Sequence, residues 1–153
     1  MTQSALNAAH IVGGDARYTF VEFDDDTSRV TFLVEFFMYR DAFSNGAPFD
    51  SPNTNNGGAN FGIYRQNLNG DWSFIRILRD VDHGPVTNVP RVDNPCVDEP
   101  TNVGVEQTRY AFEVTLDIGN TSYIITYQRC CRNNSINNII APGETGATFF
   151  VEI

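Results

Sequence analysis

Strict alternation of apolar and polar residues runs through most of the chain and predicts β-strands. In the stretch 109–117, the apolar positions are every second residue: Tyr110, Phe112, Val114 and Leu116. A period of two places one set of side chains on a buried face and the other on a solvated face. The same pattern predicts further strands near Arg17–Phe23, Arg29–Tyr39, Phe61–Gln66, Trp72–Arg79, Ser122–Arg129 and Ala147–Ile153.

The residues between these predicted strands favour antiparallel hairpins. Asn69-Gly70 supplies the positive φ angles of a tight turn, and Asp24-Asp25-Asp26 is expected at the tip of the first hairpin. The Arg29–Tyr39 strand is apolar on both faces, which is typical of a central strand. About seven or eight strands in about 145 residues predict an all-β, two-sheet antiparallel β-sandwich, immunoglobulin-like or jelly-roll-like, with long loops.

The length of the chain, 153 residues, is typical of a single domain. Asn7-Ala8-Ala9 has the small residues of a signal-peptidase site, but no basic or apolar region precedes it. We therefore expect residues 1–9 to be a tag or linker remnant and residues 10–153 to form one β-sandwich domain.

Composition restricts the class of partner. The chain has 19 acidic and 10 basic residues, a net charge of −9, and every basic residue is an arginine. Such an acidic chain is repelled by phosphate backbones and by anionic membranes, so we expect no nucleic acid and no membrane insertion. With 41% hydrophobic and 12% aromatic residues, the chain is too apolar for a disordered acidic tail. It resembles an extracellular β-protein in composition.

The three cysteines have no metal-ligand spacing, because Cys96 stands alone and Cys130 and Cys131 are adjacent. We expect a disulfide from Cys96 to Cys131 or to Cys130, which would require an oxidising compartment. The alternative is three unpaired cysteines in the core.

One long stretch, Asp41 to Asn60, is rich in Asn, Gly, Ser and Pro and lacks strand alternation. A loop of about twenty residues in a compact domain is usually functional or disordered. Exposed aromatic residues can stack on sugar faces, and Trp72, Tyr64, Tyr39 and Phe43 are candidates, although alternating strand positions favour packing for most of them. We therefore predict the ligand contacts in this loop, at Phe43, Asn45, Phe49, Asn55 and Asn56.

Catalytic chemistry is poorly represented. The two histidines are His10 and His83, and no nucleophile elbow, zinc-protease pattern or phosphate loop occurs. We therefore predict no enzymatic activity and no cofactor, with calcium as the one candidate metal. Its ligands would be Asp24, Asp25 and Asp26, or Asp80 and Asp82, but solvated turn carboxylates are the favoured alternative.

The C-terminal third carries a family resemblance. The run Tyr127-Gln128-Arg129-Cys130-Cys131-Arg132-Asn133 and the later run Pro142-Gly143-Glu144-Thr145-Gly146-Ala147-Thr148 resemble a domain of large Bacteroidetes surface proteins. Those proteins are similar to type IX secretion substrates of gliding motility and adhesion. Tyr39-Arg40-Asp41 and Asn94-Pro95-Cys96 extend the resemblance upstream, although Ala42 and Gly104 stand where relatives often carry cysteines. The loss of both implies that Cys96 bridges Cys130 or Cys131.

This resemblance implies a location more than an activity. It implies a secreted protein at the cell surface that meets the secretion machinery in transit. Guanidinium groups satisfy loop carbonyls or carboxylates, which favours a structural role over a ligand-binding role for five polar residues: Arg40, Asp41, Arg129, Arg132 and Asn133.

Three hypotheses follow. The first is a non-enzymatic adhesin or motility-associated domain that recognises a surface polysaccharide or a neighbouring cell-surface protein. The second is a structural module that pairs with copies of itself in an oligomer or filament, or with neighbouring domains. The third is a calcium-dependent carbohydrate-binding module.

Overall fold

The computed structural model describes residues 11–43, 47–54, 57–90, 96, 103–119, 121–130, 132 and 136–153. The predicted remnant, residues 1–9, lies outside this range. The strands are β1 (Ile11–Asp24), β2 (Arg29–Asp41), β3 (Ala59–Gln66), β4 (Trp72–Val81), β5 (Thr87–Asn88), β6 (Val105–Asp117), β7 (Tyr123–Arg129) and β8 (Ala147–Glu152). A 3-10 turn, η1 (Pro142–Glu144), precedes β8. In the described part, no helix is long and apolar enough to cross a bilayer.

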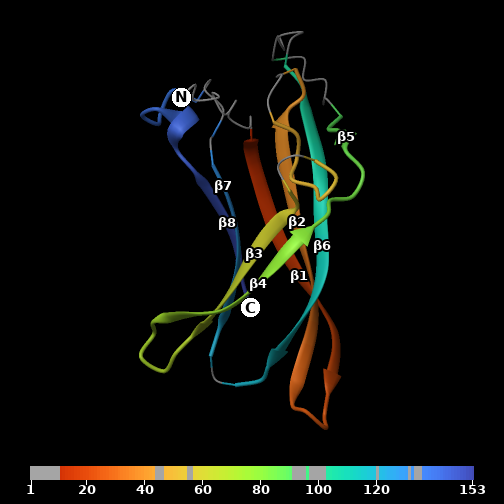
Figure 1. Ribbon diagram of the computed structural model, residues 1–153, viewed down its shortest axis with the longest axis vertical. Helices are drawn as coiled ribbons and strands as arrows, with labels where there is room; N and C mark the ends of the chain where they lie inside the picture. The colour runs from red at the N-terminus through yellow and green to blue at the C-terminus, as the bar shows by residue number, and fades with distance from the viewer. Residues whose placement is uncertain are drawn as a thin grey trace.

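The strands form two four-stranded antiparallel sheets, in the orders β1-β2-β6-β5 and β4-β3-β7-β8. The two sheets lie face to face, and the β1–β2 hairpin reaches beyond the other strands at the lower end of the molecule (Figure 1). This arrangement confirms the predicted all-β fold with two antiparallel sheets. It also shows that β2, apolar on both faces, is a central strand between β1 and β6.

An aromatic core joins the sheets around Phe61 of β3. Its ring centroid lies 4.9 Å from that of Phe36 and 5.7 Å from that of Tyr110, both in the first sheet. Tyr127 of β7 stacks on Phe61 at 5.2 Å. Each such pair contributes about 0.5–1.5 kcal/mol of stability beyond the contribution of its buried area. Contacts between these rings therefore help to hold the two sheets together.

The predicted disulfide from Cys96 is not found. Cys96 is exposed in the connection between β5 and β6, and the disulfide that involves Cys130 does not include it. This connection leaves the β5 edge of the first sheet, whereas Cys130 follows β7, an inner strand of the second sheet. Spacing along the chain cannot reveal whether folding brings two distant cysteines within the Cα separation of about 4.4–6.8 Å that a disulfide requires. Cys131 lies outside the described residues.

Glu35 of β2 is buried on the outer face of the first sheet, where it is 3% exposed. Arg17 Nε lies 2.7 Å from one carboxylate oxygen, and Arg109 Nη1 lies 2.9 Å from the other. The register of β1 places Arg17 directly opposite Glu35. The hydrogen bond from Arg17 is the main reason that the pKa of Glu35 is lowered.

A carboxyl group whose pKa is lowered by folding stabilises the fold above its ordinary pKa, and this contribution is lost as the pH falls through the folded value. We expect Glu35→Gln to lower the free energy of unfolding by about 1–2 kcal/mol near pH 7, because both arginine partners are largely solvated. The variant should also lose less stability between about pH 5 and about pH 3. Urea unfolding at each pH measures both effects. Asp25→Asn, in an exposed turn, is the control variant and should lose as much unfolding free energy on acidification as the wild type. If Glu35→Gln also lost as much as these two proteins, the assignment would be contradicted.

Candidate binding surface

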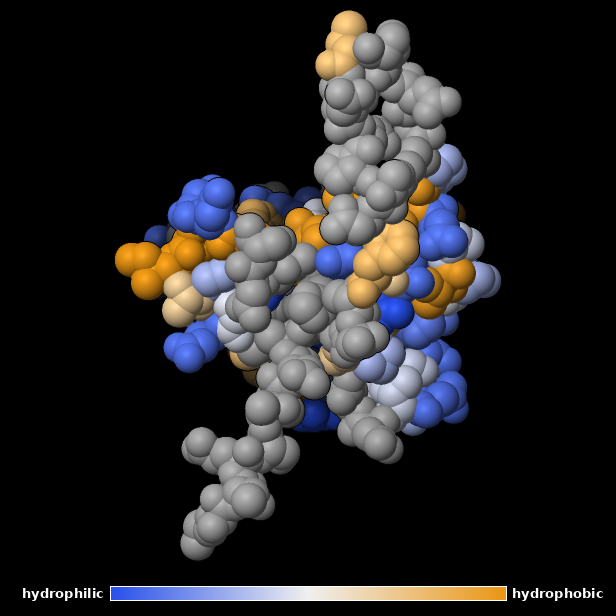
Figure 2. Space-filling model, turned by 90° about the horizontal axis from the view of Figure 1, so that it is seen from above, coloured by the Kyte–Doolittle hydropathy of each residue, from blue (hydrophilic) through white to orange (hydrophobic). Residues whose placement is uncertain are grey.

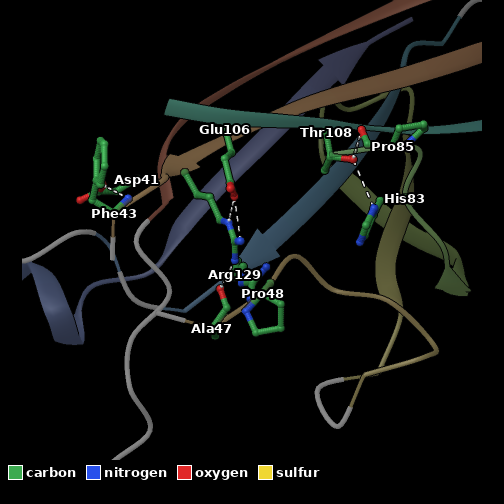
Figure 3. Close-up of polar contacts among 10 residues, drawn as sticks. Asp41, Phe43, Ala47, Pro48, His83, Pro85, Glu106, Thr108 and Arg129 are labelled. Carbon is green, nitrogen blue, oxygen red and sulfur yellow. Dashed lines mark hydrogen bonds and ion pairs between the residues drawn. The ribbon is translucent and has the colours of Figure 1, made fainter. Parts of the chain in front are cut away.

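The main chain of residues 47–51, in the predicted ligand loop, is held against the upper end of the sandwich. The carbonyl of Ala47 accepts a hydrogen bond from Arg40 Nη1 at 3.1 Å. The carbonyl of Pro48 accepts one from Arg129 Nη2 at 2.7 Å. Figure 3 shows Arg129, Ala47 and Pro48 gathered at this end. Two arginines from different sheets therefore fix the segment in place.

Asp50 completes this attachment with its backbone and its side chain. Its carbonyl accepts a hydrogen bond from the hydroxyl of Tyr110 at 2.9 Å. Its carboxylate accepts one from the hydroxyl of Tyr127 at 2.5 Å and lies 3.3 Å from Arg129 Nη2. Burial raises the pKa of both tyrosines far above the usual range. Both phenols are therefore neutral hydrogen-bond donors at physiological pH.

Phe49, predicted as a ligand contact, belongs to the core and is 1% exposed. Arg40, which also forms a 2.7 Å ion pair with Glu106, places its guanidinium 5.0 Å from the centre of the Phe49 ring. The ring of His83 packs directly against Phe49, with 5.9 Å between the two ring centroids. The prediction is wrong because this part of the loop folds back onto the core. The flanking Asn, Gly and Pro residues are typical of an exposed loop and give no sign of it.

The other predicted ligand-loop residues have different positions. Phe43 is 62% exposed, and its amide donates a 2.9 Å hydrogen bond to Asp41 Oδ1. Seen from above, the coloured apolar residues form separate groups among hydrophilic ones (Figure 2). The described residues at this end therefore present no continuous apolar platform. Three of the predicted contacts lie outside the described residues: Asn45, Asn55 and Asn56.

The arginines for which we expect a structural role bind loop backbone in the structure. Arg40 and Arg129 hold the segment 47–51, as described above. Arg132 Nε donates to the carbonyl of Gly146 at 3.1 Å, which ties the chain after β7 to the start of β8. Asn133, predicted with this group, lies outside the described residues.

The carboxylates considered for calcium are engaged in turns. Asp24 accepts hydrogen bonds from the hydroxyl of Thr27 at 2.7 Å and from its amide at 3.2 Å, and the hydroxyl is the main cause of its lowered pKa. Asp82 accepts from Asn53 Nδ2 at 3.2 Å and from the amide of His83 at 2.9 Å. Across the described ranges, no group of three or more His, Cys, Asp or Glu residues could hold a metal ion. The geometry therefore gives no support to calcium at either predicted set: Asp24, Asp25 and Asp26, or Asp80 and Asp82.

His83 also has a structural environment. Its Nδ1 lies 2.6 Å from the carbonyl of Gly84 and 3.3 Å from the hydroxyl of Thr108. That hydroxyl also donates to Gly84 at 2.9 Å, and Thr108 is buried. Figure 3 shows this group of contacts beside Pro85. A buried threonine bound to a carbonyl cannot reach a substrate, so this pair offers no nucleophile.

The outer face of the second sheet carries an exposed aromatic surface, which we call the aromatic face. The inner positions of β3 and β7 are buried, so the alternate positions of the same strands point outward. On the edge strands, Trp72 is 39% exposed, Phe74 is 58% exposed and Phe150 is 60% exposed. The aromatic face consists of six outward residues: Tyr64, Trp72, Phe74, Ile77, Ile124 and Phe150.

Cross-strand pairing places the residues of this face next to one another. Phe74 is opposite Tyr64, and their ring centroids are 5.6 Å apart. Gly62 lies next to Tyr64 on the same face, and a Cβ atom at this glycine would be 2.9 Å from the Tyr64 ring. The glycine therefore lets the tyrosine ring lie over the sheet.

Charge is scarce on this face. Two cross-strand rows of this face end on β8, at Glu152 and at Phe150, and Trp72 lies outside both rows, opposite Gln66. The other outward residues of these rows, including Thr126 of β7, are uncharged. With neighbouring strands about 4.8 Å apart, four strands give a nearly neutral surface about 14 Å wide. A contiguous exposed apolar surface of this kind usually marks an interaction site.

Comparison with protein-family models, curated proteins and solved structures finds no match to this chain. In the described part of the structure, residues 47–51 are held as scaffold, whereas the aromatic face is exposed.

The Asp50 anchor makes a testable prediction. Asp50→Ala leaves the guanidinium of Arg129 and the hydroxyl of Tyr127 without their acidic partner in a largely buried place. We expect the free energy of unfolding to fall by about 2–4 kcal/mol. Asp26→Ala, in the exposed β1–β2 turn, should change it by less than about 0.5 kcal/mol. Guanidinium chloride unfolding followed by circular dichroism measures the unfolding free energy of both variants. Equal losses in the two variants would show that Asp50 does not hold the loop against the sandwich.

Proposed function

We propose that this chain is a non-enzymatic recognition domain of a secreted cell-surface adhesin or motility-associated protein. Its aromatic face would bind the flat, neutral faces of a surface polysaccharide. The observation that carries the proposal is the row of exposed aromatic side chains on the outside of the second sheet. Exposed tryptophan and phenylalanine are costly in water unless a partner covers them.

The chemistry of the aromatic face suits a sugar chain. One face of a pyranose ring presents C–H groups, which stack on the electron-rich face of an aromatic ring. Trp72, Phe74 and Tyr64 lie within two adjacent strands, so they can contact consecutive sugar units. Gln66, opposite Trp72, and Thr126, next to Gly62, supply neighbouring polar groups for sugar hydroxyls. A mostly apolar surface with a few polar groups is typical of ligand sites.

The scaffold is suited to holding such a face rigid. The sheet orders correspond to strands A-B-E-D and C′-C-F-G of an immunoglobulin-like sandwich, which supports that topology over a jelly roll. Tyr123, at the start of β7, donates its hydroxyl to the carbonyl of Asp117 at 3.1 Å. This contact resembles the tyrosine corner of immunoglobulin-like domains. Rigid sheets present a preorganised surface, which reduces the entropic cost of binding.

The extracellular location rests on the sequence. The runs 127–133 and 142–148 resemble a domain of Bacteroidetes surface proteins that are similar to type IX secretion substrates. The absence of lysine and the net charge of −9 agree with a partner that is neither nucleic acid nor anionic membrane. A domain displayed at the cell surface is positioned to meet polysaccharides or neighbouring cells.

An assembly role is the second candidate, because β1 is an edge strand of the first sheet and only its start, at Ile11, bridges another segment on that side within the described residues. This strand of 14 residues pairs with β2 on one side and carries exposed apolar residues toward its end. Tyr18 and Phe20 pack edge-on against Phe32 but remain largely solvent-exposed. Exposed edge strands can pair with another chain, which would join copies into an oligomer or filament.

The test is binding to an array of neutral oligosaccharides, followed by titration calorimetry with the strongest binder. We expect Trp72→Ala and Phe74→Ala each to raise Kd by about tenfold or more, as is typical of aromatic hot spots. Phe20→Ala is the matched control, because Phe20 and Phe74 are similarly exposed, at 59% and 58%. Its Kd should stay within about twofold of the wild type.

Three results would redirect the proposal. Loss of sugar binding in Phe43→Ala with normal binding in Trp72→Ala would move the site to the loop. Loss of binding on addition of a chelator would favour a calcium-dependent module. Dimers that form with rising concentration, dissociate in Phe20→Ser and bind no sugar would establish the assembly role.

A further inference from the structure

A cavity lies at the lower end of the sandwich, away from residues 47–51. A pocket of about 490 Å³ opens beside the β3–β4 turn, and a smaller one of about 100 Å³ continues between the sheets. The two share Arg65 and Ile75 in their walls. A volume of this size is within the range of small-molecule sites and can hold a single sugar unit.

The charge of this cavity is opposite to that of the chain. Among the described wall residues are Arg29, Arg65 and Arg76, whereas Asp117 is the one carboxylate in that part of the wall. Three of the ten arginines of a protein with a net charge of −9 therefore meet at one opening. Positive charge concentrated in a cleft attracts anions locally even where the whole molecule repels them, since salt screens charges beyond about 8 Å.

The three arginines are engaged to different degrees. Arg29 Nε pairs with Asp117 Oδ1 at 3.1 Å. Arg65 Nε donates to the hydroxyl of Thr121 at 3.1 Å, and its guanidinium lies 5.9 Å from the centre of the Tyr123 ring. Arg76 has no hydrogen bond or ion pair within the described part of the chain. Arg76 therefore keeps its full bidentate donor capacity for a ligand.

The rest of the wall suits the body of a sugar. Gln66, Asn67 and Ser73 offer amide and hydroxyl groups, and Leu68 and Ile75 offer apolar surface. We infer that this cavity, the arginine pocket, binds an acidic sugar unit whose carboxylate or sulfate is held by Arg76 and Arg65. The pocket borders the aromatic face at Gln66 but contains none of the six residues that define that face, so this inference does not depend on the proposed function.

Arg76 and Arg79 provide a matched pair of variants. Both are exposed residues of β4, but Arg79 does not line the pocket. Calorimetric titration at low ionic strength would use three trisaccharides: galacturonic acid, sulfated galactose and neutral galactose. We expect at least one acidic trisaccharide to bind and the neutral one to bind at least about tenfold more weakly. Arg76→Gln should weaken acidic binding by about tenfold, and Arg79→Gln by less than about twofold.

The pattern of binding identifies the anion. Tighter binding of the galacturonic acid probe assigns the pocket to carboxylates, and tighter binding of the sulfated probe assigns it to sulfate esters. Persistence of acidic binding in Trp72→Ala would show that the pocket acts independently of the aromatic face, and its loss would overturn that separation. Equal affinity for all three probes, no binding of either acidic probe, or equal effects of Arg76→Gln and Arg79→Gln would overturn the inference.

Discussion

The carboxylate of Asp50 is the contact on which the upper end of the molecule depends. It joins Tyr127 and Arg129 of the second sheet, while its carbonyl receives the hydroxyl of Tyr110 from the first. One residue of the long connection therefore bridges both sheets and seals the end of the aromatic core. The burial of Phe49 follows, because that ring is carried inward with its neighbour. Residues 47–51 of the loop are therefore part of the scaffold, and the proposed recognition surface lies elsewhere, on the outside of the second sheet.

The strand pattern of the fold was predictable because burial on one face imposes a period of two. The strands around Phe61, Trp72 and Tyr110 match this pattern. The pattern does not predict the full length of β1, which begins at Ile11, because Gly13 and Gly14 there carry no hydropathic signal. Gly14 is required by packing instead, since a Cβ atom would lie 2.8 Å from the sulfur of Met38. The two residues of β5 were not predicted as a strand, because they lie in a proline-rich stretch without alternation of apolar and polar residues.

The position of the aromatic face was less predictable. Alternation divides the side chains of a strand between two faces, but it does not show which face packs against the other sheet. Trp72 and Tyr64 are candidates for sugar stacking, but their alternating strand positions favour packing. A bulge in β4 near Ile75 determines which β4 side chains point outward, since it places Phe74 opposite Tyr64 on the outer face. Pairings between distant segments, such as that of Arg129 with Asp50, leave no local signal in the sequence. The lack of a local signal for pairing between distant segments also explains why the predicted disulfide from Cys96 is wrong.

The central claim is that ligands meet the outer face of the second sheet while the Asp50-anchored segment serves as scaffold. Mapping of backbone amide shifts by NMR during titration with a neutral oligosaccharide from the array tests it most directly. The account predicts shifts concentrated on β3 and β4 and on the facing parts of β7 and β8, with residues 47–51 unchanged. Shifts confined to residues 41–54, with β4 unaffected, would contradict it.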